Sequence, residues 1–337
     1  METAYLKNYD GPALRVMEVC GTHTAAIFRS GIRSFLSPKI RLVSGPGCPV
    51  CVTAPAYIDR CIEICLTPGH ELLCFGDLMK VPGTERTLSD AGGMGGRVRM
   101  VWSPFDALAL AEKDPSTTFV VAAIGFETTT PAFGLLLEEA ETRGLGNIKL
   151  LTSLKSALAA IDWICAMGET IDAFLCPGHV SVITGADAYI PLAEKYGKPF
   201  VVAGFESEHL LAAIRAAVMD AAEGRGGVRN FYTEAVSASG NTKALEITSK
   251  YFELGDADWR GLGNVADSGY YLKEAYREYG DGSFSGHGDE NCKCGDIILG
   301  RIDPNECPLF GSQCTPSHPV GPCMVSSEGA CGYWYRG

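Results

Sequence analysis

Short apolar segments recur through the first two thirds of the chain, each followed by a Gly-, Pro- or Thr-containing turn and then by a stretch with helical apolar spacing. This alternation is typical of βα units that build a parallel sheet covered by helices. We therefore predict an α/β fold. Strands are expected at 14–19, 40–44, 71–75, 97–102, 118–124, 148–152, 173–176 and 199–203, and helices at 24–30, 54–65, 104–112, 131–143, 154–167, 190–196 and 208–222.

The later βα units resemble the earlier ones at an offset of a little over one hundred residues. The string Cys74–Gly83 aligns with Cys176–Gly185, and Glu18–Thr24 aligns with Ala123–Thr129. The alternative is that βα turns look alike in many proteins. A duplication predicts two similar parallel-sheet domains whose strands end at one shared cleft. The expected boundaries are 1–114 for the first α/β domain, 115–226 for the second, related one, and 227–337 for a Cys-rich C-terminal domain.

The charge balance limits the classes of partner. The chain has 28 Lys and Arg against 40 Asp and Glu, a net charge of −12, which would repel nucleic acid and an anionic membrane surface alike. Its start carries no basic segment followed by an apolar one, and every apolar run is broken well before the roughly 20 residues of a membrane span. We expect a soluble cytoplasmic protein, monomeric on its own, that binds neither nucleic acid nor membrane.

Fourteen cysteines are far more than a chain of this length ordinarily carries, and six of them lie in the last 46 residues. This proline-rich end has little room for a hydrophobic core, so we expect a metal centre to stabilise its fold. The spacing Cys307-x6-Cys314-x8-Cys323-x7-Cys331 is wider than that of zinc knuckles and favours a [4Fe-4S] cluster, with zinc as the alternative. The neighbouring Cys292 and Cys294 are further possible ligands.

A C-x-x-C stands in Gly45-Pro-Gly-Cys-Pro-Val-Cys51, between an expected strand and an expected helix. Thiols at this spacing can close a disulfide with little backbone motion, and a helix N-terminus lowers the pKa of an exposed thiol. Cys48 and Cys51 therefore indicate a redox dithiol or metal handling. Half of a four-ligand metal site and an inert turn are the alternatives.

A second strand-to-helix turn carries Cys20-Gly-Thr-His-Thr24. Cys20 and His23 could converge on one ion, or the imidazole could hold the cysteine as a thiolate. The plainer interpretation is a partly buried cysteine and a histidine that caps the helix. Because Cys48 and Cys51 are expected at the same edge of the sheet, three thiols and one imidazole would gather soft ligands at one place.

Six strings together resemble the HypD family of [NiFe]-hydrogenase maturation proteins, in order from about Val16 to the C-terminus. They are Met17-Glu-Val-Cys-Gly-Thr-His-Thr24, Ser44-Gly-Pro-Gly-Cys-Pro-Val-Cys-Val-Thr53, Gly76-Asp-Leu-Met-Lys-Val-Pro-Gly83, Gly125-Phe-Glu-Thr-Thr129, Cys176-Pro-Gly-His-Val180 and Gly321-Pro-Cys-Met-Val-Ser-Ser-Glu-Gly329. Six long motifs in register are far more specific than one C-x-x-C.

The resemblance implies a maturation scaffold with redox-active thiols rather than a conventional turnover enzyme. With a HypC-type chaperone and a HypE-type cyanide donor, such a protein assembles the Fe(CN)2CO unit of the hydrogenase. By the same resemblance, Cys20 would ligate that iron with His23 nearby, and Cys48 and Cys51 would be the redox dithiol. The four cysteines expected to hold the [4Fe-4S] cluster are Cys307, Cys314, Cys323 and Cys331. A stand-alone iron–sulfur thiol–disulfide oxidoreductase is the alternative function.

Overall fold

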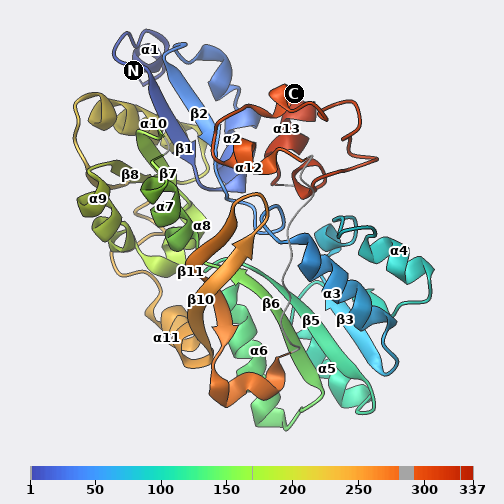
Figure 1. The fold of residues 1–337 in the computed structure, drawn as a ribbon. Coiled ribbons are helices and arrows are strands. Elements are labelled where there is room, and N and C mark those ends of the chain that lie inside the picture. Colours follow the sequence, from blue (N-terminus) through green and yellow to red (C-terminus); the bar gives the residue numbers. More distant parts are fainter. Residues whose placement is uncertain (1, 169, 281–291, 327, 337) are drawn as a thin grey trace.

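The computed structural model describes residues 2–168, 170–280, 292–326 and 328–336 (Figure 1). Its strands are β1 (Leu14–Glu18), β2 (Ile40–Ser44), β3 (His70–Cys74), β4 (Val98–Met100), β5 (Thr118–Gly125), β6 (Ile148–Lys155), β7 (Ala173–Cys176), β8 (Pro199–Val202), β9 (Gly227–Asn230), β10 (Phe252–Trp259) and β11 (Gly263–Leu272). All eight predicted strands are present, with ends within three residues of the prediction.

The helices cover these strands. They are α1 (Glu2–Lys7), α2 (Gly21–Arg29), α3 (Pro55–Leu66), α4 (Leu88–Gly93), α5 (Asp106–Lys113), α6 (Thr130–Arg143), α7 (Ala157–Ala166), α8 (Gly178–Thr184), α9 (Ile190–Tyr196), α10 (Ser207–Ala222), α11 (Thr242–Tyr251), α12 (Cys294–Ile298) and α13 (Ala330–Arg336). Among the described residues, no helix has both the length and the apolar character needed to cross a membrane.

The strands form two sheets. The first sheet has the order β2-β1-β7-β8-β9, and all its pairs are parallel. The second has the order β10-β11-β6-β5-β3-β4. Its pairs from β6 to β4 are parallel, whereas β11 pairs antiparallel with β6 and with β10. The mixed α/β architecture with two largely parallel sheets agrees with the predicted fold class.

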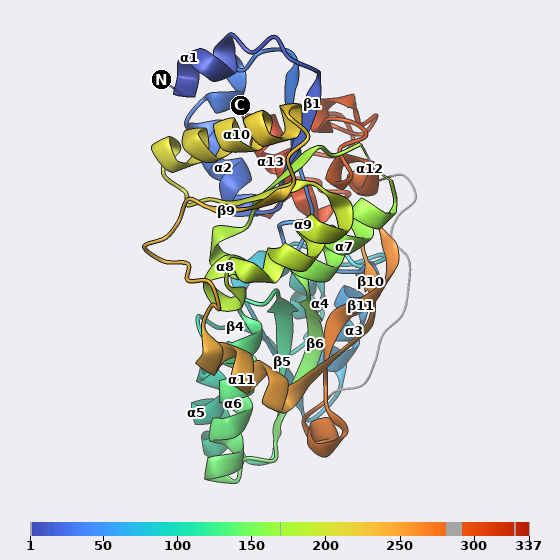
Figure 2. The same ribbon diagram turned by 90° about the vertical axis from the view of Figure 1, so that its left-hand side faces the viewer.

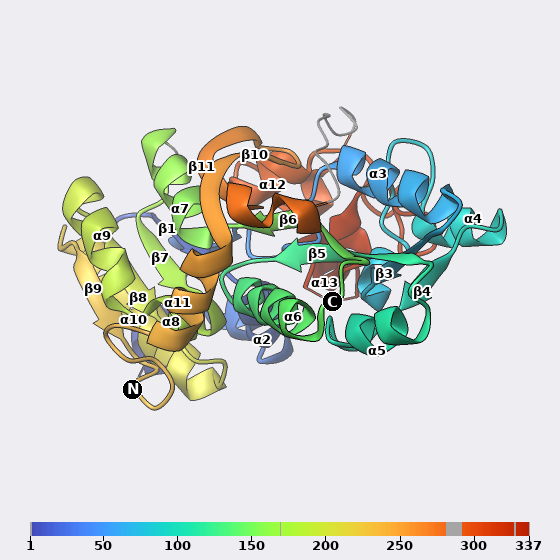
Figure 3. The same cartoon turned by 90° about the horizontal axis from the view of Figure 1, so that it is seen from below.

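Alternating side chains place each sheet between two layers of helices, because successive residues of a strand point to opposite faces. In the first sheet, Val16 packs toward α2 and α10, and its neighbour Met17 packs toward α7 and α9 (Figure 2). In the second sheet, Leu72 packs toward α3 and α4, and Leu73 toward α5 and α6 (Figure 3). Each sheet is thus buried on both faces, as parallel sheets usually are.

The sheets do not follow the expected boundaries at residues 114 and 226. β1 and β2 pair through β7 with β8, whereas β3 and β4 pair with β5 and β6. Each half of the chain therefore gives two strands to each sheet. The strands of the two halves can be matched in order: β1 to β5, β2 to β6, β3 to β7 and β4 to β8. The four matched strands then follow the same order in both sheets. In each sheet, the first two strands from one half of the chain lie beside the last two strands from the other half. This shared order agrees with a duplication whose halves have exchanged strand pairs.

Residues beyond 226 first extend both sheets. β9 completes the edge of the first sheet, α11 packs on α6, and the β10–β11 hairpin joins β6 of the second sheet. The Cys-rich segment proper begins at Cys292 among the described residues, and α12 and α13 pack against β2 and α2 (Figure 1). The ring of Tyr333 on α13 is stacked on Phe28 of α2, with centroids 6.0 Å apart.

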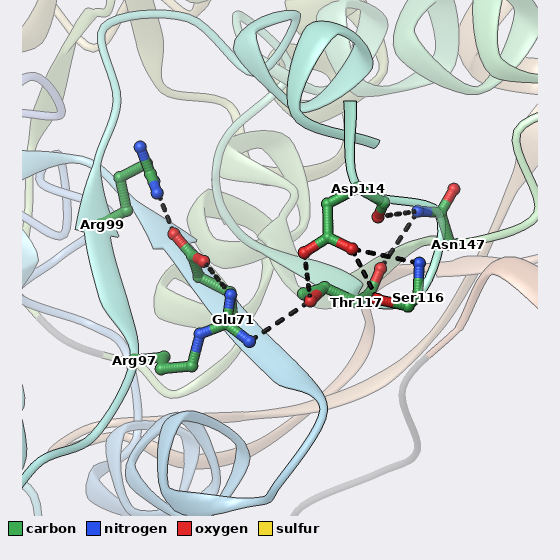
Figure 4. A network of polar contacts seen from close by, with 7 residues as sticks. All are labelled: Glu71, Arg97, Arg99, Asp114, Ser116, Thr117 and Asn147. Carbon is green, nitrogen blue, oxygen red and sulfur yellow. Dashed lines mark hydrogen bonds and ion pairs between the residues drawn. The ribbon is translucent and has the colours of Figure 1, made fainter. Parts of the chain in front are cut away.

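A polar network ties the amino ends of the second sheet, away from the carboxyl ends of its parallel strands (Figure 4). Glu71 at the start of β3 is ion-paired with Arg97 and Arg99, and Arg97 also donates to Thr117. Asn147 donates to the carbonyl oxygens of residues 111, 114 and 117, just before β5. These contacts hold strand ends together.

Candidate functional site

The carboxyl ends of strands from both sheets converge on one cavity of about 270 Å³, which we call the cleft cavity. The turns after β1, β2, β3, β5 and β7 line it, together with Glu328 of the C-terminal segment. These are the turns that carry the sequence motifs. Lining residues include Val19, Cys20 and Thr22 after β1, Gly47, Pro49 and Val50 after β2, Phe75, Asp77 and Leu78 after β3, Phe126, Thr128 and Thr129 after β5, and Pro177, His179 and Val180 after β7.

Cys20 sits at the junction of β1 and α2 with extended backbone, φ −157° and ψ 123°. The side chain lines the cleft cavity and is 6% exposed. Burial raises the pKa of Cys20 to about 11, although the backbone N–H groups of His23 and Thr22 oppose the rise. The thiol is therefore protonated near neutral pH, and a metal ion would have to displace that proton in order to bind.

Two glycines allow neighbouring segments to reach this turn. A Cβ on Gly47 would lie 2.4 Å from the backbone nitrogen and Cα of Cys20. A Cβ on Gly21 would lie 2.4 Å from the Cβ of Glu328. The C-x-x-C loop and the C-terminal segment thus both pack directly on the Cys20 turn, at distances that only glycine permits.

His23 lies near Cys20 in sequence, but its imidazole is directed elsewhere. The ring is fully buried, and Nε2 is 3.1 Å from the carbonyl oxygen of Ala203, to which it donates. Burial lowers the pKa of His23 to about 4, so the ring is neutral near pH 7. Nδ1 has no hydrogen-bond partner among the described residues, and His23 does not line the cleft cavity.

Asp77 and His179 bring polar side chains to the cleft cavity from the turns after β3 and β7. These two turns belong to the repeats Cys74–Gly83 and Cys176–Gly185, and both line one cavity. Burial raises the pKa of Asp77. The ring of His179 packs on the ring of Phe205, with centroids 4.2 Å apart. Glu127, from the Gly-Phe-Glu-Thr-Thr motif, instead accepts hydrogen bonds from Ser156 and from the backbone of Ala157, at the start of α7.

Cys48 and Cys51 lie in a turn that ends before α3 begins at Pro55, so the expected helix N-terminus is not at the dithiol. Both thiols are buried, 5% and 3% exposed. The Cys48 sulfur is 3.2 Å from the backbone nitrogen of Cys51 and 3.1 Å from the hydroxyl oxygen of Ser326. Burial raises the pKa of Cys51 well above its usual value, and the adjacent thiols of Cys323 and Cys48 raise it further.

All six C-terminal cysteines line a second small cavity, which we call the thiol cavity: Cys292, Cys294, Cys307, Cys314, Cys323 and Cys331. Burial raises the pKa of Cys331, and four neighbouring thiols raise it further. Cys294 has Cys292 as its hydrogen-bond partner. Among the described residues, no three His, Cys, Asp or Glu side chains meet as the ligands of a single metal ion would. The thiols surround a volume rather than a point.

A third small cavity connects these features, and we call it the bridging cavity. It is lined by Cys48, Cys51, Cys323 and Glu328, and Glu328 also lines the cleft cavity. The Thr22 hydroxyl donates to the Glu328 carboxylate at 2.9 Å. Glu328 and Ser326 stand in the Gly321–Gly329 motif, but nothing in that string marks either one as a site residue. They become recognisable only where that segment docks beside Cys20 and Cys48.

Comparison with known proteins places the chain within one family. The HypD family model, described as "Hydrogenase formation hypA family", matches residues 3–337. A hydrogenase maturation factor HypD of Azotobacter vinelandii is 43% identical, covering 95% of this chain and 88% of its own length. The HypD factors of Escherichia coli K12 and Rhodobacter capsulatus are 40% and 39% identical, each with 96% of this chain and 89% of the relative covered.

Proposed function

This chain belongs to the HypD family of hydrogenase maturation factors, and we propose from this premise that it is the scaffold on which the Fe(CN)2CO unit of a [NiFe]-hydrogenase is assembled. One observation supports the proposal above all. Motif turns from both sheets surround a single cavity with the Cys20 thiol at its wall. A cavity of about 270 Å³ suits a small iron complex rather than an extended substrate.

In this proposal Cys20 ligates the cargo iron. Iron that carries cyanide and carbonyl is soft, and a thiolate suits it as a ligand. The two backbone N–H groups beside the sulfur stabilise the thiolate once its proton has left. The apolar side chains of Val19, Phe75 and Phe126 line the cavity and limit the access of water to the bound iron.

Polar groups elsewhere on the cavity wall would orient the diatomic ligands. His179 and Thr128 reach the cleft cavity from the turns after β7 and β5, and Asp77 reaches it from the turn after β3. Hydrogen bonds donated by the His179 ring and the Thr128 hydroxyl to cyanide nitrogens would distinguish cyanide from carbonyl, which accepts hydrogen bonds poorly. Cys20 would thus hold the iron, and these polar side chains would set its orientation.

The thiol cavity fits a [4Fe-4S] cluster held by Cys307, Cys314, Cys323 and Cys331, because each iron of a cluster takes its own thiolate and the thiols need not meet at one point. A bound cluster would supply single electrons. Cys51 lies against Cys323, so Cys48 and Cys51 would form a dithiol next to a ligand thiol. Cys292 and Cys294 are hydrogen-bonded to each other in the same cavity and are the alternative ligands.

A maturation factor works with other maturation proteins, and we propose a HypC-type chaperone and a HypE-type cyanide donor as those partners. The contact of Cys51 with Cys323 also favours a second candidate, a stand-alone iron–sulfur thiol–disulfide oxidoreductase. The two functions differ in iron beyond the cluster. A scaffold binds additional iron that carries cyanide and carbonyl, whereas an oxidoreductase binds none and turns over disulfides.

The test is anaerobic isolation with the HypC-type chaperone, followed by infrared spectroscopy and counts of iron and acid-labile sulfide. The scaffold predicts cyanide and carbonyl bands that Cys20→Ser abolishes without changing the sulfide count. Cys165→Ser is the matched control, because Cys165 is also buried but lies on α7 outside the three cavities. Absence of the bands from the unmodified complex, together with catalytic disulfide reduction, would overturn the scaffold in favour of the oxidoreductase.

A further inference from the structure

The two thiols of the dithiol have different surroundings. The Cys48 sulfur faces the backbone N–H of Cys51 at 3.2 Å and the Ser326 hydroxyl at 3.1 Å. The backbone N–H of Glu328 donates to the Ser326 oxygen at 3.2 Å. Because that oxygen already accepts a hydrogen bond, the hydroxyl hydrogen can point to Cys48. Two donors therefore converge on one sulfur.

The Cys51 sulfur has other thiols as its neighbours. Cys48 and Cys323 both lie next to it, and Cys51 is buried. Thiols are weak donors compared with an amide or a hydroxyl, so they stabilise negative charge on a neighbouring sulfur poorly. The backbone N–H of Cys51 and the Ser326 hydroxyl thus both face the Cys48 sulfur and not the Cys51 sulfur.

We propose that Cys48 is the attacking sulfur of the dithiol, that Ser326 is the positioning residue that holds it, and that Cys51 resolves the product. The inference rests on the redox dithiol of the proposed function and assigns a separate role to each of its residues. Ser326 is 2% exposed and lies three residues after Cys323, so the hydroxyl reaches Cys48 only while the C-terminal segment is docked. Reactivity of the dithiol thus depends on that docking.

The reaction proposed for the dithiol is thiol–disulfide exchange, and its co-reactant is a disulfide. The Cys48 thiolate attacks one sulfur of the disulfide, a mixed disulfide forms, and the first thiolate leaves with the electron pair of the broken bond. Cys51, after losing its proton, attacks the Cys48 sulfur and releases the second thiolate. The dithiol loses two electrons and two protons, and the disulfide becomes two thiols.

The test measures attack at each sulfur with methyl methanethiosulfonate, a probe small enough for a buried site. A thiolate that attacks it becomes a methyl disulfide, and methanesulfinate leaves. The full-length protein is reduced, kept anaerobic and labelled for timed intervals, and modification is counted by peptide mass spectrometry. Cys51→Ser isolates Cys48, and Cys48→Ser isolates Cys51.

We expect Cys48 in Cys51→Ser to be labelled at least about tenfold faster than Cys51 in Cys48→Ser, since both donors serve Cys48. Adding Ser326→Ala to Cys51→Ser should slow labelling about fivefold, the effect of one hydrogen bond. Ser326→Thr, which keeps the hydroxyl, should restore the rate. Ser312→Ala, at an exposed serine bonded to local carbonyl groups, should leave the rate unchanged.

Three results would overturn the assignment: equal rates at the two sulfurs, faster labelling of Cys51, or no effect of Ser326→Ala. A rise in labelling at both cysteines after Ser326→Ala would also overturn it, because it would mean that the serine only keeps the segment closed. The proposed function fails by a different result. If the oxidised wild-type protein never contains a Cys48–Cys51 disulfide, the redox dithiol itself is wrong, whatever the order of the labelling rates.

Discussion

Replacing Gly47 with alanine tests whether the C-x-x-C loop is packed on the Cys20 turn. The new Cβ would lie 2.4 Å from the nitrogen and Cα of Cys20, about 1 Å closer than atoms in ordinary contact. Both colliding groups are backbone, so a rotamer change cannot relieve the clash. Either the loop or the turn after β1 must move.

The magnitude follows from two opposing effects. Overpacking at a buried contact costs about 1–3 kcal/mol, and an alanine in place of glycine restores about 0.4–1 kcal/mol by restricting the unfolded chain. The expected net loss is about 1–2 kcal/mol of the free energy of unfolding. For a protein of 337 residues that loss lowers Tm by about 1–3 °C. The displaced loop should also disturb Pro49 and Val50, which line the cleft cavity.

The assay is thermal unfolding of the reduced protein beside a matched control. Gly146→Ala serves as the control, because a Cβ there has no atom within 4 Å and the residue lacks a positive φ. The control should melt at or slightly above the wild-type temperature, whereas Gly47→Ala should melt below it. A Gly47→Ala protein that melts like the control would refute the close packing of the C-x-x-C loop on the Cys20 turn.

Three further predictions concern other parts of the molecule. Cys314→Ser should reduce acid-labile sulfide per chain to a small fraction of the wild-type count, whereas Cys61→Ser, at a buried cysteine outside the thiol cavity, should not. Thr22→Val should cost about 0.5–1.5 kcal/mol of unfolding free energy by removing the hydrogen bond to Glu328, measured by denaturant unfolding. Burial lowers the pKa of Lys155 to about 7, so the unfolded chain binds a proton that the folded chain has released. Wild-type stability should therefore rise with pH relative to Lys155→Met, by about 1.4 kcal/mol per unit from about pH 8 to about pH 10, and parallel curves would contradict this.

The strands could be predicted because their signal is local. Apolar runs such as Phe119–Ile124 and Phe174–Cys176 show a buried strand without reference to any partner. Strand pairing carries no such local signal. The two halves of the chain resemble each other, so pairing of β1 with β3 or with its repeat, β7, would satisfy the same apolar pattern. For this reason the sequence supported two similar sheets without showing which strands belong to each of them.

The sequence predicted those parts of the candidate site that directly follow strands. Cys20, Asp77 and His179 follow strands, and parallel strands bring their carboxyl ends together. The direction of His23 was not predictable, because Cys20 has extended backbone and helical spacing does not relate the two side chains. Ser326 and Glu328 lie some three hundred residues from the turns that they contact, so only the docking of the C-terminal segment reveals them.

The exchanged strand pairs make the connections between the sheets part of the site. The chain crosses from β2 to β3, from β6 to β7 and from β9 to β10. The first crossing carries Cys48 and Cys51, and the second carries Ala157, which lines the cleft cavity. Gly47 is packed on Cys20, and Cys48 is hydrogen-bonded to Ser326. These contacts fix the position of the first crossing segment at its start. Under the proposed function, a change in the width of the cleft would displace the Cys48 turn, and we expect iron bound at Cys20 to change the rate at which Cys48 is labelled.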